Sequence, residues 1–487
     1  MRIRSLAFAL AGALAALSLC VGAAPAQAAD ALTGQVSSAQ EGAMEGVVVS
    51  ARKADSIVTV SVVTDATGHY RFPAGRLEPG AYTLAIRATG YDIDGKATAE
   101  VASDKAATSD LKLKPARNLP AQLSNAEWLA SMPGSDGQKK ALLNCIGCHD
   151  LDRIVRSTHD ADEFMQIFDR MAGYYPGSTP ENPQRLIGDA RRNIGQGPGI
   201  RGMAEYLASV NLSNDDTWTY PLKTFKRPTG RATHVVITEY DLPRKIIQPH
   251  DVILDAQGQV WFTHFAEQFL GRFDPKTLKV SEYPLPVIKE GYPIGTLDLE
   301  ADKSGKLWIS MMYQAGVARF DPKTEKFETW AVPKEWQTDA TQQAFMTPVS
   351  SDVDGKVWVK NSDRAQILRL DPATGKWETF GSFKDPATGK TITSYGIPAD
   401  ADNNLYLLDF ASSNVGRLDA KTGELKVFKG AIANSRPRRG RFDDQNRLWF
   451  AEYGSNGVGN VHSCTLPDFG SSIPMALPPY SANHSRF

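Results

Sequence analysis

Cysteine is scarce in this chain, and its scarcity limits how the fold can be held together. Only four of the 487 residues are cysteines. Cys20 lies in the N-terminal apolar stretch, and the other three are Cys145, Cys148 and Cys464. Exported proteins usually pair their cysteines in disulfides, but one close pair and one remaining cysteine do not make a disulfide framework. The close pair therefore needs another chemical explanation.

The chain also lacks an excess of charge of either sign and, after its N-terminus, long apolar runs. It has 54 Lys and Arg against 55 Asp and Glu, for a net charge of −1. Without a basic surplus it cannot neutralise many phosphates, so nucleic acid is not an expected partner. No segment after residue 28 reaches the roughly 18 to 20 apolar residues that a membrane-spanning helix needs. We therefore expect no membrane span once the N-terminal segment is removed.

The N-terminal segment has the three parts of a secretory signal peptide. Arg2 and Arg4 give it a positive start, residues 6–21 are apolar, and Ala26-Gln27-Ala28 fits the small-residue cleavage pattern. We assign residues 1–28 to a signal peptide. The mature protein is then secreted, which in a Gram-negative cell means the periplasm; an uncleaved membrane anchor is the alternative.

Residues 31–115 alternate apolar and polar side chains at the period of β-strands, with Gly, Asp and Pro turns between the runs. Short strands at this spacing predict a small β-sandwich. The run TDATGHYRFPAGRLEPGAYTLAIRATGY, residues 64–91, resembles the carboxypeptidase regulatory-like (transthyretin-like) domain. The resemblance implies a module that binds, orients or stabilises a neighbouring domain, without peptidase activity.

Residues 116–212 change to a helical period in three runs, KKALLNCIGCHDLDRIV, DADEFMQIFDRMAGYY and RGMAEYLASVNL. Two thiols spaced as in the first run can bond the two vinyl groups of a haem, and the histidine that follows them can bind its iron. We therefore predict one covalent haem c, bound by Cys145 and Cys148 with His149 as an iron ligand, in a cytochrome c-like domain. A redox disulfide and half a zinc site are the alternatives; the chain lacks the βαβ context of the first and the second cysteine pair of the other.

The second iron ligand is left open between three residues. In the second helical run, apolar residues recur at i, i+3, i+4 and i+7 from Phe164 to Met171, which makes one apolar face. Met171 is our candidate iron ligand, although the same pattern fits a core residue. Met203 and His159 are its rivals. A methionine ligand would raise the potential of the iron and favour electron transfer.

From about residue 230 onward, β-type patterns return and repeat. Five segments carry an aromatic residue with an aspartate six positions before it: Asp255 and Trp261, Asp302 and Trp308, Asp352 and Trp358, Asp400 and Tyr406, and Asp443 and Trp449. Eleven positions after the first four aromatics an arginine begins an Arg-apolar-Asp motif: Arg272, Arg319, Arg369 and Arg417. A unit of 43 to 50 residues that repeats with fixed turn signals predicts the blades of a β-propeller.

The repeats VWFTHFAEQFLGRFDPKT and LWFAEYGSNGVG resemble the virginiamycin B lyase (streptogramin lyase) family over residues 232–459. The resemblance implies a seven-bladed ring in which a His and a Glu, fourteen positions apart in one repeat, act near a magnesium ion. No repeat here combines the two. The corresponding pairs are His250 and His264, Leu297 and Met311, Thr347 and Asn361, Tyr395 and Asp409, and Arg438 and Glu452. We take His250, His264 and Glu452 as candidate catalytic residues and a divalent metal near them as a candidate cofactor. The polar set expected near the propeller axis also includes Tyr395, Asp409 and Arg438.

The repeat pattern ends near residue 459. Asn460-Val461-His462 stands where a fifth Arg-apolar-Asp motif is expected, and the tail to residue 487 is not repeat-like. Five repeats and one earlier strand, VVITEYDLP, are fewer than seven blades need. Either a smaller ring closes, or the C-terminus is truncated or altered.

These patterns predict a multidomain chain with a β-sandwich over residues 31–115, an α-helical cytochrome c-like domain over residues 116–212 and an all-β propeller over residues 230–487. The predicted function is periplasmic haem electron transfer, coupled to oxidation of a small-molecule substrate or partner bound at the propeller. Its redox partner would be a periplasmic cytochrome or dehydrogenase. We expect an oxidoreductase component rather than a lyase. The alternatives are a streptogramin lyase-like enzyme acting in the propeller and a non-enzymatic redox scaffold.

Overall fold

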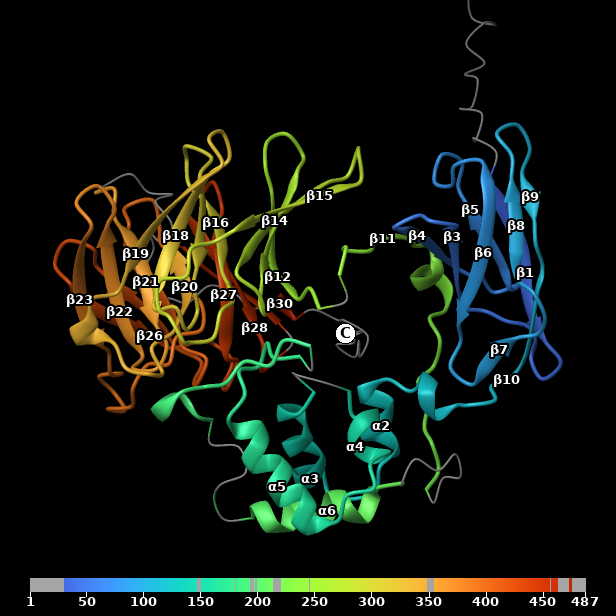
Figure 1. Cartoon of the computed structure of the whole chain (residues 1–487), viewed down its shortest axis with the longest axis horizontal. Coiled ribbons are helices and arrows are strands. Elements are labelled where there is room, and N and C mark those ends of the chain that lie inside the picture. The colour runs from blue at the N-terminus through green and yellow to red at the C-terminus, as the bar shows by residue number, and fades with distance from the viewer. Residues whose placement is uncertain are drawn as a thin grey trace, which may run out of the picture. The chain divides into compact units, whose positions relative to one another are not determined.

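The computed structural model describes residues 30–146, 150–179, 181–192, 197, 199–212, 220–244, 246–347, 354–455, 457–462 and 473–474 (Figure 1). Within these residues the chain forms two compact units. The first joins the residues up to Gln122 with Thr224–Asp241, and the second joins Leu123–Lys223 with the residues from Leu242 onward. Each unit is therefore built from two separate stretches of the sequence.

The first unit is a β-sandwich, as the period-two pattern predicted. One sheet runs β2-β1-β10-β7, with β5 and β9 also pairing with β1, and the other runs β11-β4-β3-β6-β8. The strands are β1 (Leu32–Ser38), β2 (Gly42–Ala43), β3 (Val48–Lys53), β4 (Val58–Val63), β5 (His69–Phe72), β6 (Gly80–Arg87), β7 (Tyr91–Ile93), β8 (Thr98–Val101), β9 (Ala107–Thr108), β10 (Leu111–Pro115) and β11 (Val236–Tyr240). Alternate residues of β1, from Leu32 to Ser38, are buried in the core. Burial of this apolar face is the main source of stability for such a sheet pair.

Strand β11 was expected near the start of the propeller, in the run VVITEYDLP. The structure places it in the sandwich, where it pairs antiparallel with β4 along its whole length, with Thr238 opposite Val60. Figure 1 shows this green strand beside the blue strands of the first unit. An unpaired β4 would leave a row of backbone donors and acceptors at the sheet edge. The sandwich is thus completed by a strand that lies more than a hundred residues further along the chain than β10.

The described part of the chain between the sandwich and the propeller holds five α-helices. They are α2 (Asn125–Ser131), α3 (Asp136–Ala141), α4 (Asp152–Val155), α5 (Ala161–Ala172) and α6 (Ile200–Val210). The 3-10 turns of the described chain are η1 (Pro120–Gln122), η2 (Leu142–Asn144), η3 (Gly188–Ala190), η4 (Gly230–Thr233) and η5 (Lys334–Trp336). Helix α5 begins at a capping box, in which Asp160 and Glu163 each accept a hydrogen bond from the other's backbone, as the sequence predicted. None of the helices among the described residues is both long and apolar enough to cross a membrane.

The prediction of an α-helical cytochrome c-like domain over residues 116–212 is wrong. Within the described residues the protein is mostly β, and only α5 and α6 among its described helices are longer than two turns, with 12 and 11 residues. The first predicted helical run is broken into α3, η2 and α4, which are too short to enclose a core of their own. The stretch between α5 and α6 is rich in Gly and Pro, and its Tyr175, Leu186 and Ala190 are buried in a core shared with the propeller. The helical segment therefore packs as part of the second unit.

The rest of the second unit consists of five consecutive antiparallel sheets in the described residues, in a propeller-like arrangement (Figure 1). The first three are β12-β13-β14-β15, β16-β17-β18-β19 and β20-β21-β22-β23, and the last two are β24-β25-β26 and β27-β28-β29-β30. Their bounds are β12 (Pro249–Leu254), β13 (Val260–His264), β14 (Phe269–Asp274), β15 (Lys279–Pro284), β16 (Leu299–Ala301), β17 (Leu307–Ser310), β18 (Gly316–Asp321), β19 (Lys326–Ala331), β20 (Gln343–Thr347), β21 (Val357–Asn361), β22 (Gln366–Asp371), β23 (Lys376–Ser382), β24 (Leu405–Leu408), β25 (Val415–Leu418), β26 (Leu425–Phe428), β27 (Pro437–Phe442), β28 (Arg447–Glu452), β29 (Gly457–His462) and β30 (Ile473–Pro474). Each sequence repeat thus corresponds to one sheet.

The fixed offsets of the repeat have a structural cause. In three repeats the aspartate six positions before the tryptophan accepts a hydrogen bond from the indole nitrogen, at 2.8 Å from Trp261, 3.0 Å from Trp308 and 2.8 Å from Trp449. The arginine eleven positions later lies over the indole ring, as Arg319 does over Trp308 at 5.3 Å. The repeated residues therefore hold the sheets together, and functional residues must be sought at positions that vary between repeats.

Candidate active site on the first strands of the propeller sheets

The first strands of three propeller sheets bring charged side chains together. Arg439 on β27 donates to Asp251 Oδ2 on β12 at 2.9 Å and lies 4.0 Å from Asp298 Oδ1, just before β16. Arg441, two residues after Arg439 on β27, forms an ion pair with Glu300 on β16. The first, second and fifth sheets therefore meet through ion pairs. We call His250, Asp251, Asp298, Glu300, Arg439 and Arg441 the inner-strand cluster.

The pKa values of the two aspartates of the cluster are shifted in opposite directions. Burial, with the nearby charges of Glu300 and Asp251, raises the pKa of Asp298 well above its usual range. Burial alone would also raise the pKa of Asp251, but interactions with His250, Arg439 and Asp298 outweigh it and hold that pKa below its usual range. Asp251 is therefore the stronger acid of the two neighbouring carboxyls. A neighbouring acid and base with separated pKa values are typical of a site that moves protons.

His250 is a partly exposed member of the cluster. Its Nδ1 lies 2.8 Å from Asp251 Oδ1, and its side chain is 31% exposed. The imidazole ring stacks on Phe265, with ring centroids 5.4 Å apart and planes at 23°. Asp251 fixes the ring in the tautomer that carries its proton on Nδ1, so Nε2 is left as a proton acceptor. Among the described residues, none makes a hydrogen bond to Nε2.

His264, the second histidine predicted for the site, has different neighbours. It is fully buried at the end of β13, with Nδ1 3.6 Å from Glu267 and Nε2 3.4 Å from Glu282. Arg244 pairs with both glutamates. Burial lowers the pKa of His264 despite the two carboxylates. His264 is therefore a neutral member of an ionic network within the first sheet.

The other predicted polar residues divide into two groups. Arg438 and Tyr395 are brought together, with the guanidinium donating to the phenol oxygen at 2.8 Å. Glu452 is buried at the end of β28 and accepts a hydrogen bond from Ser455 at 3.0 Å. Asp409 accepts hydrogen bonds from the backbone of Ala411 in its own turn and from the backbone of Thr393, 16 positions earlier in the chain. The carboxylates of Glu452 and Asp409 thus both accept hydrogen bonds from nearby protein groups.

A row of aromatic rings and cations adjoins the inner-strand cluster. Phe345 lies 4.7 Å from Tyr395 and Tyr395 lies 5.4 Å from Phe410, between ring centroids, and Phe410 lies 5.3 Å from Tyr453. The cations of Lys360, Arg436, Arg438 and Arg439 lie over these rings at 4.0 to 5.4 Å. We call these four rings, with Lys360, Arg436 and Arg438, the aromatic–cation row. Arg439 belongs to the cluster and touches the row through Phe345, so the two form one continuous surface.

The segment after α5 forms part of the surroundings of His250. Tyr175 is 1% exposed, and its ring stacks on Phe265 with centroids 5.3 Å apart. The Tyr175 hydroxyl donates to the carbonyl of Phe265 at 2.5 Å, and Gln184 donates to the carbonyl of Ala266 at 2.8 Å. Because Phe265 is also the ring on which His250 stacks, the helical segment supports the orientation of His250 through one intervening side chain.

The predicted haem residues are only partly described. Cys145 lies half-buried after η2, whereas Cys148 and His149 lie outside the described residues. Met171 is half-buried near the end of α5, on the face where Phe164 and Phe168 are buried. Its rival Met203 is half-buried on α6, and His159 lies 3.4 Å from Glu163. The amphipathic face of α5 is confirmed, and the iron ligands stay predictions.

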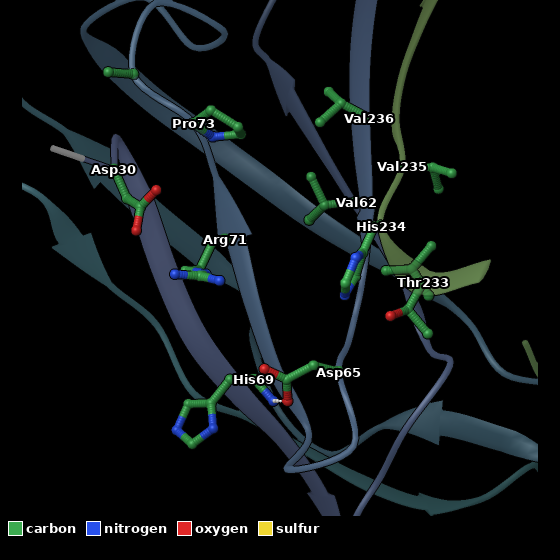
Figure 2. Close-up of a pocket in the computed structure, with 12 residues that line it drawn as sticks. Asp30, Val62, Asp65, His69, Arg71, Pro73, Thr233, His234, Val235 and Val236 are labelled. Atoms are coloured by element: carbon green, nitrogen blue, oxygen red, sulfur yellow. Dashed lines mark hydrogen bonds between the residues drawn. The ribbon is translucent and has the colours of Figure 1, made fainter. Parts of the chain in front are cut away.

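A separate groove lies on the sandwich. It has a volume of about 510 Å³ and is lined by His69 and Arg71 of β5 and by Thr233 and His234 before β11 (Figure 2). The dashed line in Figure 2 runs from the backbone of His69 to Asp65, whose carboxylate also accepts a hydrogen bond from Thr67. Asp65 is thus occupied in stabilising its turn. Across the described residues, no group of three or more His, Cys, Asp or Glu side chains is arranged to hold a metal ion.

The sequence reasoning missed most of the inner-strand cluster, although a signal was present. Asp251, Asp298 and Arg439 each lie four positions before the repeat aspartate of their sheet, at Asp255, Asp302 and Asp443. Glu300 and Arg441 share the position two residues before it. Charged residues at one repeat position, where other repeats have Pro348 and Gly396, could have indicated a shared site. Lys360 and Phe345 gave no such signal.

The sandwich region of the chain matches a known protein family. Residues 31–114 match the carboxypeptidase regulatory-like domain family. No curated protein matches the chain.

Among solved structures, virginiamycin B lyase from Staphylococcus aureus is similar at 22% identity, over 50% of this chain and 75% of that chain, with a TM-score of 0.40. A streptogramin B lyase is similar at 21% identity, over 47% of this chain and 70% of that chain, with a TM-score of 0.39. A gluconolactonase from Xanthomonas campestris is similar at 15% identity, over 42% of this chain and 68% of that chain, with a TM-score of 0.32. These likenesses concern the β-propeller fold.

Proposed function

We propose that the propeller carries the active site of a small-molecule enzyme that works by general acid–base catalysis, with His250 as the proton-transferring residue. The observation that carries the proposal is the 2.8 Å contact between His250 Nδ1 and Asp251, itself held by Arg439. A histidine oriented by a buried carboxylate, with its other nitrogen accessible, is the usual form of a general base. This function corresponds to the lyase-like alternative of the sequence analysis.

The reaction class suggested by the site is proton abstraction at an ester-like bond. The proton comes either from a carbon of the substrate, so that the bond is eliminated with its carboxylate as the leaving group, or from a water molecule that then hydrolyses the bond. His250 would accept the proton, and Asp251 would stabilise the imidazolium that forms. Arg439 keeps Asp251 ionised. The family's His–Glu pair is replaced in this arrangement by His250 and its sequence neighbour Asp251.

The test uses the mature chain and a panel of cyclic esters, including a streptogramin B depsipeptide and aldonolactones, with products followed by mass spectrometry. We expect His250→Asn to lower kcat/KM by at least about a hundredfold, the scale of a lost general base, without a change in Tm. His234→Asn, on the sandwich, is the matched control and should keep full activity. Equal turnover by His250→Asn and the unaltered protein would eliminate the proposal.

We further propose that Cys145 and Cys148 hold one covalent haem c in the exported protein, with His149 as an iron ligand. The CIGCH motif and the signal peptide support this proposal, together with Met171 as a half-buried candidate for the second ligand. A bound haem would supply one-electron chemistry to a periplasmic redox partner. The contact of Tyr175 with Phe265 places the segment after the motif in the same compact unit as His250.

An absorption spectrum of the protein exported to the periplasm together with haem-attachment machinery tests the haem proposal. We expect a c-type spectrum that survives denaturation in the unaltered chain and is lost in Cys148→Ser, with Cys464→Ser as the control. Replacement of Met171 by Ala should change the reduced spectrum if sulfur binds the iron. A colourless exported protein with reactive thiols at both cysteines would contradict attachment.

A further inference from the structure

Lys360 is a buried cation that lacks an anionic partner among the described residues. It lies on β21 with 7% of its surface exposed, and its ammonium group donates to the backbone carbonyl of Ser394. No carboxylate of the described chain lies within ion-pair distance of it, whereas Arg369 on the next strand pairs with Asp354 and Glu378. Buried charges in proteins are normally paired, because removal from water is costly.

Arg438 is a second cation that has no anionic partner among the described residues. Its guanidinium donates to the hydroxyl of Tyr395 and lies 4.4 Å from the centre of that ring. Its Nε is buried and makes no hydrogen bond, and among the described residues no carboxylate forms an ion pair with it. An N–H buried without an acceptor costs free energy that a bound oxygen atom would recover.

The two cations adjoin one pair of aromatic rings. Lys360 lies over Phe345 at 5.4 Å, Arg438 lies over Tyr395, and the two rings are 4.7 Å apart. By contrast, Arg439 and Arg441 nearby are matched by Asp251, Asp298 and Glu300. Among the described residues, the positive charge without a paired carboxylate is therefore on the aromatic–cation row, which also includes Arg436. Lys360 is buried, whereas Tyr395 and Arg438 are half-buried and so partly in contact with solvent.

We propose that the aromatic–cation row is a binding subsite for a small organic acid, whose carboxylate is bound by Lys360 and Arg438 and whose planar body stacks on Tyr395. The proposal rests on the proposed function, because it names the substrate class of that site: an anion with an aromatic or planar ring. A carboxylate supplies the negative charge that both cations lack among the described residues, and an aromatic body can pack against the half-buried ring of Tyr395. Arg439 links the subsite to His250 through Asp251.

Calorimetric titration of the mature chain with benzoate tests the subsite, with neutral benzamide as the isosteric probe and acetate as the probe without a ring. Benzoate should bind at least about tenfold more tightly than either, since charge-assisted hydrogen bonds and ring stacking each contribute on this scale. Lys360→Met and Arg438→Met should each weaken benzoate binding about tenfold or more. Lys376→Met, at an exposed position of the same sheet, is the matched control and should bind benzoate as the unaltered chain does.

Equal binding of benzoate and benzamide, or absence of benzoate binding, would overturn the proposal. So would benzoate binding unaffected in both Lys360→Met and Arg438→Met. His250→Asn separates this proposal from the catalytic one, since it should lose turnover and keep benzoate affinity. Benzoate binding without any His250-dependent activity would leave the subsite standing and remove the proposed function.

Discussion

At the scale of single residues, burial decides what each charged group of the propeller does. Burial beside other carboxylates raises the pKa of Asp298, while hydrogen bonds from His250 and Arg439 lower the pKa of Asp251. Lys360 has no such partner among the described residues, and burial lowers its pKa to about 8. An unpaired buried charge of this kind reduces stability, and such a cost is common where a residue serves binding.

Lys360→Met should therefore stabilise the protein at neutral pH. An unfolded lysine has a pKa near 10.4, so between about pH 8 and pH 10 the unfolded chain binds more protons and stability rises with pH. We expect the variant to exceed the unaltered chain by about 2 kcal/mol in unfolding free energy at pH 7, with the difference shrinking by pH 10. Urea unfolding at the two pH values measures this. Lys376→Met should show no pH-dependent difference, and the same gain at both values for Lys360→Met would contradict the explanation.

At the scale of elements, the repeat aspartates and aromatics have the role of fixing each sheet. Trp308 is fully buried on β17, donates to Asp302 at 3.0 Å and stacks on Trp330 with centroids 5.3 Å apart. The same arrangement recurs around Trp261 and Trp449, where the aspartate is again the acceptor. The repeated aspartate and tryptophan therefore fix the turn that leads into the second strand of each of these sheets. The charged residues of the inner-strand cluster lie at positions that differ between repeats.

Trp308→Phe should cost about 2 to 3 kcal/mol of unfolding free energy, because it removes buried volume and leaves a carboxylate oxygen without its donor. Chemical denaturation followed by far-UV circular dichroism measures the loss. Trp336→Phe, on the half-exposed turn η5, is the matched control and should cost less than about 1 kcal/mol. A similar cost for the two variants would show that the repeat contact is not a stabilising one.

At the scale of the whole molecule, connectivity differs from a simple succession of domains. Strand β11 returns to the sandwich after the helical segment, and Leu123–Lys223 belongs to the same unit as the propeller. The segment that carries CIGCH therefore lies in the chain between two strands of one sheet. The expected independent cytochrome c-like domain does not form, because α3 and α4 are short and Tyr175 and Leu186 are buried against propeller residues.

The sequence by itself determined the local features. Period-two alternation gave the sandwich strands, the Asp160–Glu163 pair gave the start of α5, and fixed offsets from Asp255 to Trp449 gave the repeating sheets. Each of these depends on residues that are close along the chain, so periodicity and spacing suffice to predict them. His250 was named from the resemblance to the virginiamycin B lyase family, whose histidine it matches in the first repeat.

Only the tertiary structure decided which distant residues meet. Asp251 and Arg439 are separated by 188 positions and lie 2.9 Å apart, and β11 pairs with a strand far earlier in the chain, with Thr238 opposite Val60, 178 positions before it. Whether Lys360 has a counter-ion likewise depends on neighbouring sheets. The physical reason is that burial, and the pairing of charges that burial demands, are set by contacts between sheets, which no local spacing encodes.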